Sequence, residues 1–142
     1  MADAETLARQ TLALTDRRDW PAREALFTED CEFVTPLGPL YGRAATTAFS
    51  APFIGAFSNA AHQVDVLAAS GDVVAVEGVW TGTHTAPLVT PDGEVPATGR
   101  TIVLPFVMIV RTDGDLVRSV RIYFDQIAFL GQLGLLPQPA NA

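Results

Sequence analysis

The acidic residue whose setting most calls for a chemical explanation is Asp125, which ends a strand-like pattern with Ile122 and Phe124 on one face. A carboxylate that loses its water without gaining a partner costs free energy. Such groups are often paired or tuned for proton transfer. In an apolar pocket desolvation would raise the pKa of Asp125, making it a stronger base that could remove a proton next to a carbonyl group. The alternative is that Asp125 caps a helix beginning at Gln126, and from the residues alone this cap is the better interpretation.

Two further polar residues could assist Asp125. His84 could hydrogen-bond Asp125 or a substrate carbonyl, although a lone histidine near a strand end is more often just a satisfied polar group. Arg100 shares an expected strand face with apolar residues, so inside a pocket it would need an anionic partner such as Asp125. That pairing would lower the pKa of Asp125 and weaken it as a base, whereas at the pocket rim Arg100 would simply be solvated. We expect His62 to be exposed, and two scattered histidines give no metal-binding spacing, so we predict no metal.

Length and composition restrict the class of protein. The chain has 142 residues, enough for one domain with a real core, and 49% of them are hydrophobic. The formal charge of −7 argues against nucleic acid or an anionic membrane as the main partner. Cys31 is the single cysteine, so no intrachain disulfide is possible. Without a signal-peptide pattern or a membrane-spanning apolar run, the sequence indicates a soluble, cytoplasmic protein.

The elements that must position these residues begin with helices. Residues 3–15 show a helical apolar face. A short second helix is expected after Asp19 as N-cap, with Pro21 in its first turn. Residues 32–35 form a strand pattern, and 36–42 are a turn-rich loop. Residues 43–58 favour a helix that Pro52 should kink.

Strand patterns dominate the second half, at 62–68, 73–85, 98–111 and 116–125, with a hairpin loop at 91–93 and a short terminal helix. In the strand 73–85, Trp80 and His84 share one face, while Glu77 lies on the other and is expected at the surface. Both faces of the strand 98–111 are apolar, so something must cover the face that the helices do not. A second copy of the chain is the simplest cover, and we predict a homodimer through the sheet. Pro105 suggests a bulge or bend there.

The fold class predicted from this order is α+β, with helices packed on one face of a strongly curved, mainly antiparallel sheet. Such a cone-shaped barrel can hold a ligand between its layers. We expect one domain over 1–142, in which 137–142 form a flexible tail. The pattern does not decide whether the loop 86–97 closes over the pocket mouth.

Several short segments in this order resemble the SnoaL-like polyketide cyclases of the nuclear transport factor 2-like superfamily. The resemblance runs nearly end to end and implies a cone-shaped α+β barrel, usually dimeric, with an apolar pocket and no cofactor. It also implies that the aspartate ending the last strand, here Asp125, acts as acid/base in an intramolecular aldol ring closure. The motif histidine falls on His84. The matching segments are Asp19-Trp20, Phe33-Val34-Thr35-Pro36-Leu37-Gly38, Tyr41-Gly42-Arg43, Gly82-Thr83-His84-Thr85, Pro96-Ala97-Thr98-Gly99-Arg100, Tyr123-Phe124-Asp125-Gln126 and Gln132-Leu133-Gly134-Leu135.

Two related activities are disfavoured by departures from their patterns. Limonene epoxide hydrolase uses an aspartate–arginine–aspartate set, and the position of its middle acid falls here on Ile102. Ketosteroid isomerases place their base near the turn after the first strand, where this chain has Val34, Thr35 and Pro36 and no acid.

The first hypothesis is therefore a cofactor-independent cyclase or isomerase acting on a hydrophobic, polycyclic or polyketide-like molecule, with Asp125 as acid/base and His84 assisting. The alternative is a ligand-binding or purely structural dimer of the same fold, since fold does not decide function. The two differ at Asp125, which should face an enclosed cavity in the enzyme and can be a mere helix cap in the binding protein. Residues expected to bind the substrate are Trp20, Tyr41, Phe53, Phe57, Trp80, Arg100, Met108 and Tyr123.

Overall fold

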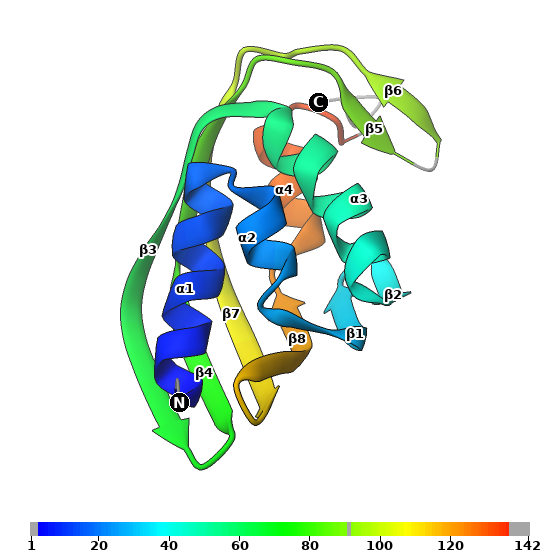
Figure 1. The fold of residues 1–142 in the computed structure, drawn as a ribbon. Coiled ribbons are helices and arrows are strands. Elements are labelled where there is room, and N and C mark those ends of the chain that lie inside the picture. Colours follow the sequence, from blue (N-terminus) through cyan, green and yellow to red (C-terminus); the bar gives the residue numbers. More distant parts are fainter. Residues whose placement is uncertain (1–2, 91, 137–142) are drawn as a thin grey trace.

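Three helices cover one face of the sheet in the computed structural model, which describes residues 3–90 and 92–136 (Figure 1). Helix α1 (Ala4–Arg17) begins where the Asp3 carboxylate accepts a hydrogen bond from the backbone N–H of Thr6 at 2.8 Å, and it buries Leu7 and Leu12. Helix α2 (Trp20–Glu24) has the predicted Asp19 cap, which accepts from the N–H of Ala22. Helix α3 (Arg43–Gly55) accommodates Pro52 and ends three residues earlier than predicted.

The main sheet has six strands in the order β2-β1-β8-β7-β4-β3. All neighbouring pairs are antiparallel except β1 with β8, which is parallel. The strands are β1 (Phe27–Thr35), β2 (Gly38–Tyr41), β3 (Phe57–Ser70), β4 (Val73–His84), β7 (Thr101–Asp113) and β8 (Leu116–Tyr123).

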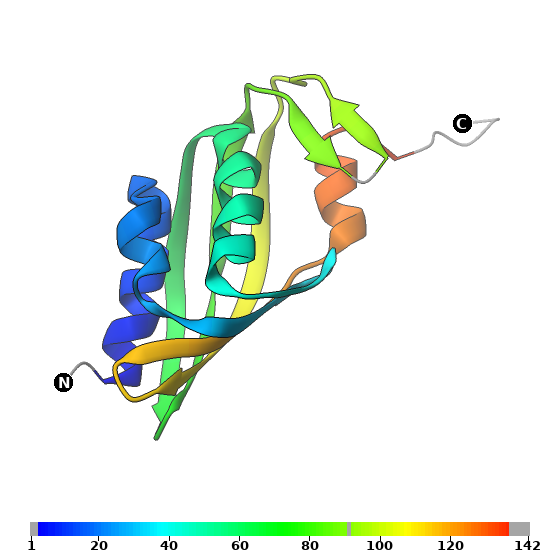
Figure 2. The same cartoon turned by 45° about the vertical axis from the view of Figure 1, so that its right-hand side comes forward.

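Two smaller elements complete the fold. Strands β5 (Leu88–Thr90) and β6 (Gly93–Val95) form a separate hairpin, and helix α4 (Gln126–Gln132) follows β8. Figure 2 shows α1 and α3 on the same side of the sheet, with the hairpin at one end of the molecule. The predicted α+β class with a curved sheet and N-terminal helices is confirmed. The sheet is not closed, because β2 and β3 remain as its two edges.

Curvature arises where β3 crosses β4. Strand β3 has irregular register between Ser58 and Ala61 and again between Val64 and Val66. Opposite these points β4 carries Gly78 and Gly82, and a Cβ on Gly78 would lie 2.0 Å from the carbonyl oxygen of Gln63. Glycine therefore permits a close backbone approach, and the bulges bend the strand over its partner. This bend encloses the space between sheet and helices.

Three differences from the predicted elements have physical reasons. The turn-rich segment 38–41 pairs with the end of β1 as strand β2, because two residues are enough for the chain to turn back. Strand β3 begins at Phe57, where helix was predicted. Pro105 does not produce the predicted bulge, because it lies in regular register opposite Val79 on β4. On its other side β7 begins to pair with β8 only at Val107. The backbone N–H that proline lacks is therefore missing where β7 has a single partner strand.

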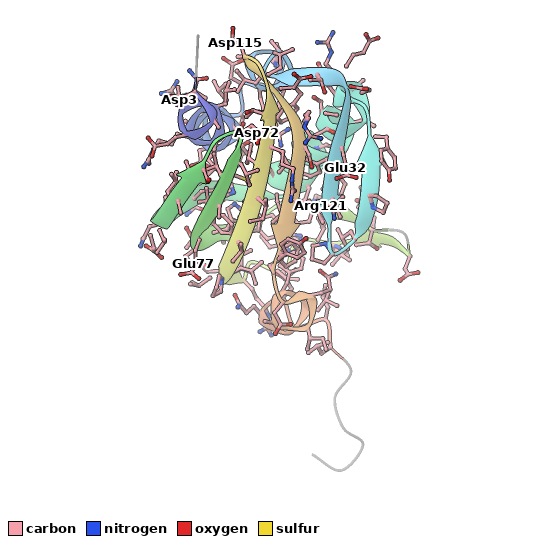
Figure 3. The ribbon with its side chains drawn as sticks, turned by 90° about the horizontal axis from the view of Figure 1, so that it is seen from below. Asp3, Glu32, Asp72, Glu77, Asp115 and Arg121 are labelled. Atoms are coloured by element: carbon pink, nitrogen blue, oxygen red, sulfur yellow. The ribbon has the colours of Figure 1, made fainter. Side chains whose placement is uncertain are left out.

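The face of the sheet away from the helices carries polar contacts. Glu32 on β1 and Arg121 on β8 point toward one another, with oxygen and nitrogen 2.9 Å apart (Figure 3). Ser119 donates a hydrogen bond to the same Glu32 oxygen at 3.1 Å. Glu77 is exposed on β4, as expected. Within 3–90 and 92–136, no helix is both long and apolar enough to cross a membrane.

Candidate functional site

A cavity of about 90 Å³ lies between the helices and the concave face of the sheet. Its wall is mainly apolar, with a few hydroxyl groups, one arginine and one histidine, and it contains no carboxylate among the described residues. Ligand pockets are commonly about 300–1,000 Å³, so in this conformation the cavity fits a small molecule, and a polycyclic one would require it to widen. The lining residues are Thr11, Leu12, Thr15, Arg23, Phe33, Thr35, Leu37, Phe49, Ser50, Phe53, Ile54, His62, Trp80, Leu104, Phe106, Met108, Val120, Ile122 and Phe124.

A histidine–aspartate pair stands at this cavity. The Nδ1 atom of His62, on β3, lies 2.6 Å from a carboxylate oxygen of Asp16, in the last turn of α1. The other oxygen of Asp16 accepts the backbone N–H of His62 at 3.1 Å. The ring packs edge-on against Phe106, and its side chain is 13% exposed. The expectation that His62 is exposed was wrong, because the bulged start of β3 turns its side chain between α1 and the sheet.

The pair fixes how the imidazole can act. A carboxylate on Nδ1 holds that nitrogen as the N–H donor, so in the neutral ring it is Nε2 that carries the lone pair. Nε2 makes no hydrogen bond to any residue within 3–90 and 92–136. A histidine base oriented by a third group is the arrangement that general acid–base catalysis uses.

A buried arginine forms part of the same wall. Arg23 lies in the last turn of α2 and is only 3% exposed. Its guanidinium carbon lies 5.1 to 5.6 Å from the centres of the rings of Trp20, Phe27 and Phe33. Burial lowers the pKa of Arg23 to about 10. Neither Arg23 nor His62 was predicted as a site residue.

The predicted catalytic pair is not joined by any hydrogen bond in the described part of the chain. Asp125 is exposed, and its carboxylate accepts a hydrogen bond from the backbone N–H of Ala128 at 3.0 Å as the N-cap of α4. His84 is fully buried at the end of β4, where Nδ1 accepts the backbone N–H of Thr98 at 3.1 Å. Burial lowers the pKa of His84. Arg100 is exposed and forms no ion pair with Asp125.

Five of the residues predicted to shape the pocket lie at the cavity or next to its wall. Phe53, Trp80 and Met108 line the cavity. Phe57 is buried behind Phe53 and Trp80, with ring centres 6.0 and 5.0 Å away, and Trp20 is half-buried beside the Arg23 guanidinium.

The other two aromatic residues face away from the cavity. Tyr123 alternates along β8 with Ile122, which lines the cavity, so its side chain points to the opposite face. Tyr41 lies on the edge strand β2, and both tyrosines border a polar hollow of about 630 Å³ on the outer face.

No cluster of three or more histidine, cysteine or acidic side chains suited to a metal occurs within 3–90 and 92–136. The loop 86–97 contains the β5–β6 hairpin, while Pro91 and the expected tail 137–142 fall outside the described residues.

Comparison with known proteins gives one sequence family and many structural neighbours. The sequence model of the SnoaL-like domain matches residues 8–120. No curated protein matches the chain significantly.

Three solved structures illustrate the structural similarity. A candidate polyketide cyclase from Xanthomonas campestris is 25% identical, with a TM-score of 0.80 over 92% of this chain and 96% of that one. IdmH from Streptomyces antibioticus, also a candidate polyketide cyclase, is 20% identical, with a TM-score of 0.77 over 94% of this chain and 99% of that one. A protein from Catenulispora acidiphila with a ketosteroid isomerase-like fold, in complex with trimethylamine, is 21% identical, with a TM-score of 0.75 over 94% and 97%.

Proposed function

Because the chain belongs to the SnoaL-like domain family, whose sequence model matches residues 8–120, we propose that it is a cofactor-independent acid/base enzyme. The reaction is an isomerisation or an intramolecular ring closure of a small hydrophobic carbonyl compound bound in the cavity. His62 is the general base and acid, and Asp16 orients it. The similarity to candidate polyketide cyclases supports the reaction class.

The observation that carries this proposal is the contact of 2.6 Å between Asp16 and Nδ1 of His62 at the wall of an apolar cavity. Nε2 of His62 takes a proton from the carbon next to the substrate carbonyl, and the electron pair of that C–H bond forms an enolate. In an isomerisation the imidazolium returns the proton to another carbon. In a ring closure the enolate attacks a second carbonyl of the same molecule, and the imidazolium protonates the resulting alkoxide. Asp16 stabilises the imidazolium in both cases.

An enolate also needs a partner for its developing negative charge. Ser50 lines the cavity and is 5% exposed, and its hydroxyl makes no hydrogen bond to the described residues. We assign it as the donor to the enolate oxygen. Thr11 and Thr15 also line the cavity, but their hydroxyls already donate to the carbonyls of Leu7 and Thr11 within α1.

The experiment measures proton abstraction directly. Wild-type protein is incubated in D₂O with cyclohexanone, 3-cyclohexenone or 2-tetralone, and deuterium uptake next to the carbonyl is followed by NMR. His62→Gln should lower the rate by about 100-fold or more, because a positioned base contributes about 10²–10⁴. Asp16→Asn should lose less, because the base remains and only its orientation changes.

Asp125→Asn is the matched control, since it removes one carboxylate and leaves a residue that also caps helices well. It should retain the exchange rate of wild type. If Asp125→Asn were inactive while His62→Gln kept its activity, the base would be Asp125, as the family resemblance implies. Exchange at the uncatalysed rate by wild type would contradict proton abstraction from these ketones.

A second candidate function is the binding of a hydrophobic ligand without chemistry. The observation in its favour is that Asp125 caps α4 and is exposed, which is the role a non-catalytic protein needs. Under this function, compounds of the panel bind to wild type and to His62→Gln with equal affinity, and neither protein speeds exchange.

A further inference from the structure

Arg23 is the one charged side chain in the described part of the chain that is buried at the cavity and lacks an anionic partner. Its Nε and Nη1 atoms are inaccessible to solvent and have no hydrogen-bond partner among the described residues. The lining of the cavity contains no carboxylate within those residues. A protein with a formal charge of −7 thus presents an unpaired cation to an apolar cavity.

This arrangement is costly without a ligand. A buried charge requires a partner, and leaving one unpaired is strongly destabilising. The rings of Trp20, Phe27 and Phe33 offer cation–π attraction, with centres 5.1 to 5.6 Å from the guanidinium carbon. These rings supply no hydrogen-bond acceptor in the plane of the guanidinium, where the Nε and Nη1 hydrogens point. Two donors of this cavity-lining arginine therefore remain without a partner in the described part of the chain.

Arg23 is still a cation at neutral pH. Although burial lowers its pKa to about 10, that value is about three units above pH 7, so nearly every molecule is protonated. Guanidinium is also more weakly hydrated than an ammonium group, which makes arginine the cation best suited to a dry site. The charge is therefore available to a ligand under physiological conditions.

We propose that Arg23 binds the carboxylate of a small hydrophobic acid held in the cavity. A carboxylate matches the fork geometry of a guanidinium with two parallel hydrogen bonds, which come from Nη2 together with either Nε or Nη1. It carries one negative charge, as the single unpaired cation requires, whereas a phosphate dianion would leave a second charge unmatched among apolar walls. The rest of the ligand faces Phe53, Trp80 and Met108. The inference rests on the proposed function and narrows its substrate class to a carbonyl compound that also carries a carboxylate.

The test uses equilibrium binding of defined probes, measured by isothermal titration calorimetry at pH 7. Isobutyrate, cyclopentanecarboxylate and benzoate are compared with their primary amides, which have nearly the same shape and no charge. Wild type should bind at least one acid about tenfold or more tightly than its amide, since charge-assisted hydrogen bonds are stronger than neutral ones.

Three variants assign this preference to Arg23. Arg23→Met should bind acid and amide equally. It should melt no lower than wild type, because a methionine of similar length removes a buried charge. Arg23→Lys keeps the charge without the fork and should retain part of the preference. Arg9→Met changes the net charge in the same way at an exposed position of α1 and should behave as wild type.

Equal binding of every acid and its amide by wild type, or no binding of either, would overturn the inference. So would an acid preference that survives in Arg23→Met. If Arg23→Met does not fold, the comparison of wild type with Arg23→Lys decides, because undiminished preference in Arg23→Lys would contradict recognition by the fork. This binding experiment measures no turnover, so its outcome is separate from that of the exchange experiment. Arg23 could bind acids even if His62 proved not to be the base. Equally, His62 could catalyse deuterium exchange even if Arg23 bound no acid.

Discussion

At the scale of single residues, His84 has a role that its burial defines. Its Nδ1 accepts the backbone N–H of Thr98, so the ring is neutral in the folded protein. Burial lowers its pKa below the ordinary value of 6.5. In the unfolded chain His84 therefore becomes protonated near pH 6.5, whereas in the folded protein it becomes protonated only at a lower pH. The contribution of His84 to stability is present above that unfolded pKa and is lost as pH falls toward the folded pKa.

We predict that the free energy of unfolding drops more on acidification in wild type than in His84→Gln. The slope from one such group is at most about 1.4 kcal/mol per pH unit. Urea denaturation of both proteins at about pH 7.5 and pH 5.5 measures the difference, because all other titrating groups are common to both. Equal losses of stability in the two proteins would show that His84 does not resist protonation in the fold.

The sequence predicted some residue roles and not others. The cap at Asp125 could be predicted because it depends on adjacent residues and a local turn. The contact of Asp16 with His62 spans 46 positions and depends on how a bulged strand crosses a helix, and no local pattern signals it. No local pattern in helix α2, where Arg23 lies two residues after Pro21, signals that this side chain is buried. The rings of Trp20, Phe27 and Phe33 lie around its guanidinium.

At the scale of elements, the close approach of β3 and β4 is the feature on which the cavity depends. Replacing Gly78 by alanine would place its Cβ 2.0 Å from the carbonyl oxygen of Gln63 and 3.2 Å from Phe106. Backbone must move to relieve the first contact. We predict a loss of stability of about 3 kcal/mol or more, at or beyond the upper end of ordinary overpacking.

Gly55→Ala is the matched control for Gly78→Ala. Gly55 ends α3, and a Cβ there would meet nothing within 4 Å. That change should be neutral or stabilise by up to about 1 kcal/mol, because glycine is a poor helix former. Thermal and urea unfolding of the three proteins checks both expectations, and a Gly78→Ala protein as stable as Gly55→Ala would contradict the close approach.

Element types were predictable where periodicity was strong, and element boundaries were less so. The alternation in β4 gave its buried face correctly, from Val74 to His84. The short segment 56–60 has no clear periodicity and is compatible with helix or strand. Its pairing with β4 makes it the start of strand β3. The parallel pairing of β1 with β8 joins the two ends of the fold and has no local signal.

At the scale of the whole molecule, the outer face of the sheet has exposed apolar side chains on β7 and β3, beside the polar contacts of Glu32, Ser119 and Arg121. Val103 on β7 is 55% exposed, and Val66 on β3 is 54% exposed. Pro105, two residues from Val103 on β7, is also exposed. Val66 pairs with Glu77 on β4, which is exposed too. The three helices lie on the other face (Figure 2). Exposed apolar side chains that are grouped on one face of a sheet favour an interaction site.

We propose that a second copy of the chain covers this face, as the apolar pattern of β7 on both sides already predicted. Val103→Lys should convert a dimer of twice 15.1 kDa into a monomer, because a buried lysine at a symmetric interface appears twice and has no partner. Val89→Lys is the control, since Val89 is 69% exposed on β5, outside the six-stranded sheet, and it should leave the mass unchanged.

Sedimentation equilibrium measures the molecular mass of all three proteins. A wild-type monomer, or a dimer that Val103→Lys leaves intact, would contradict association through this face. The cavity lies on the opposite side of the sheet, so monomeric Val103→Lys should still prefer the carboxylate probes over their amides.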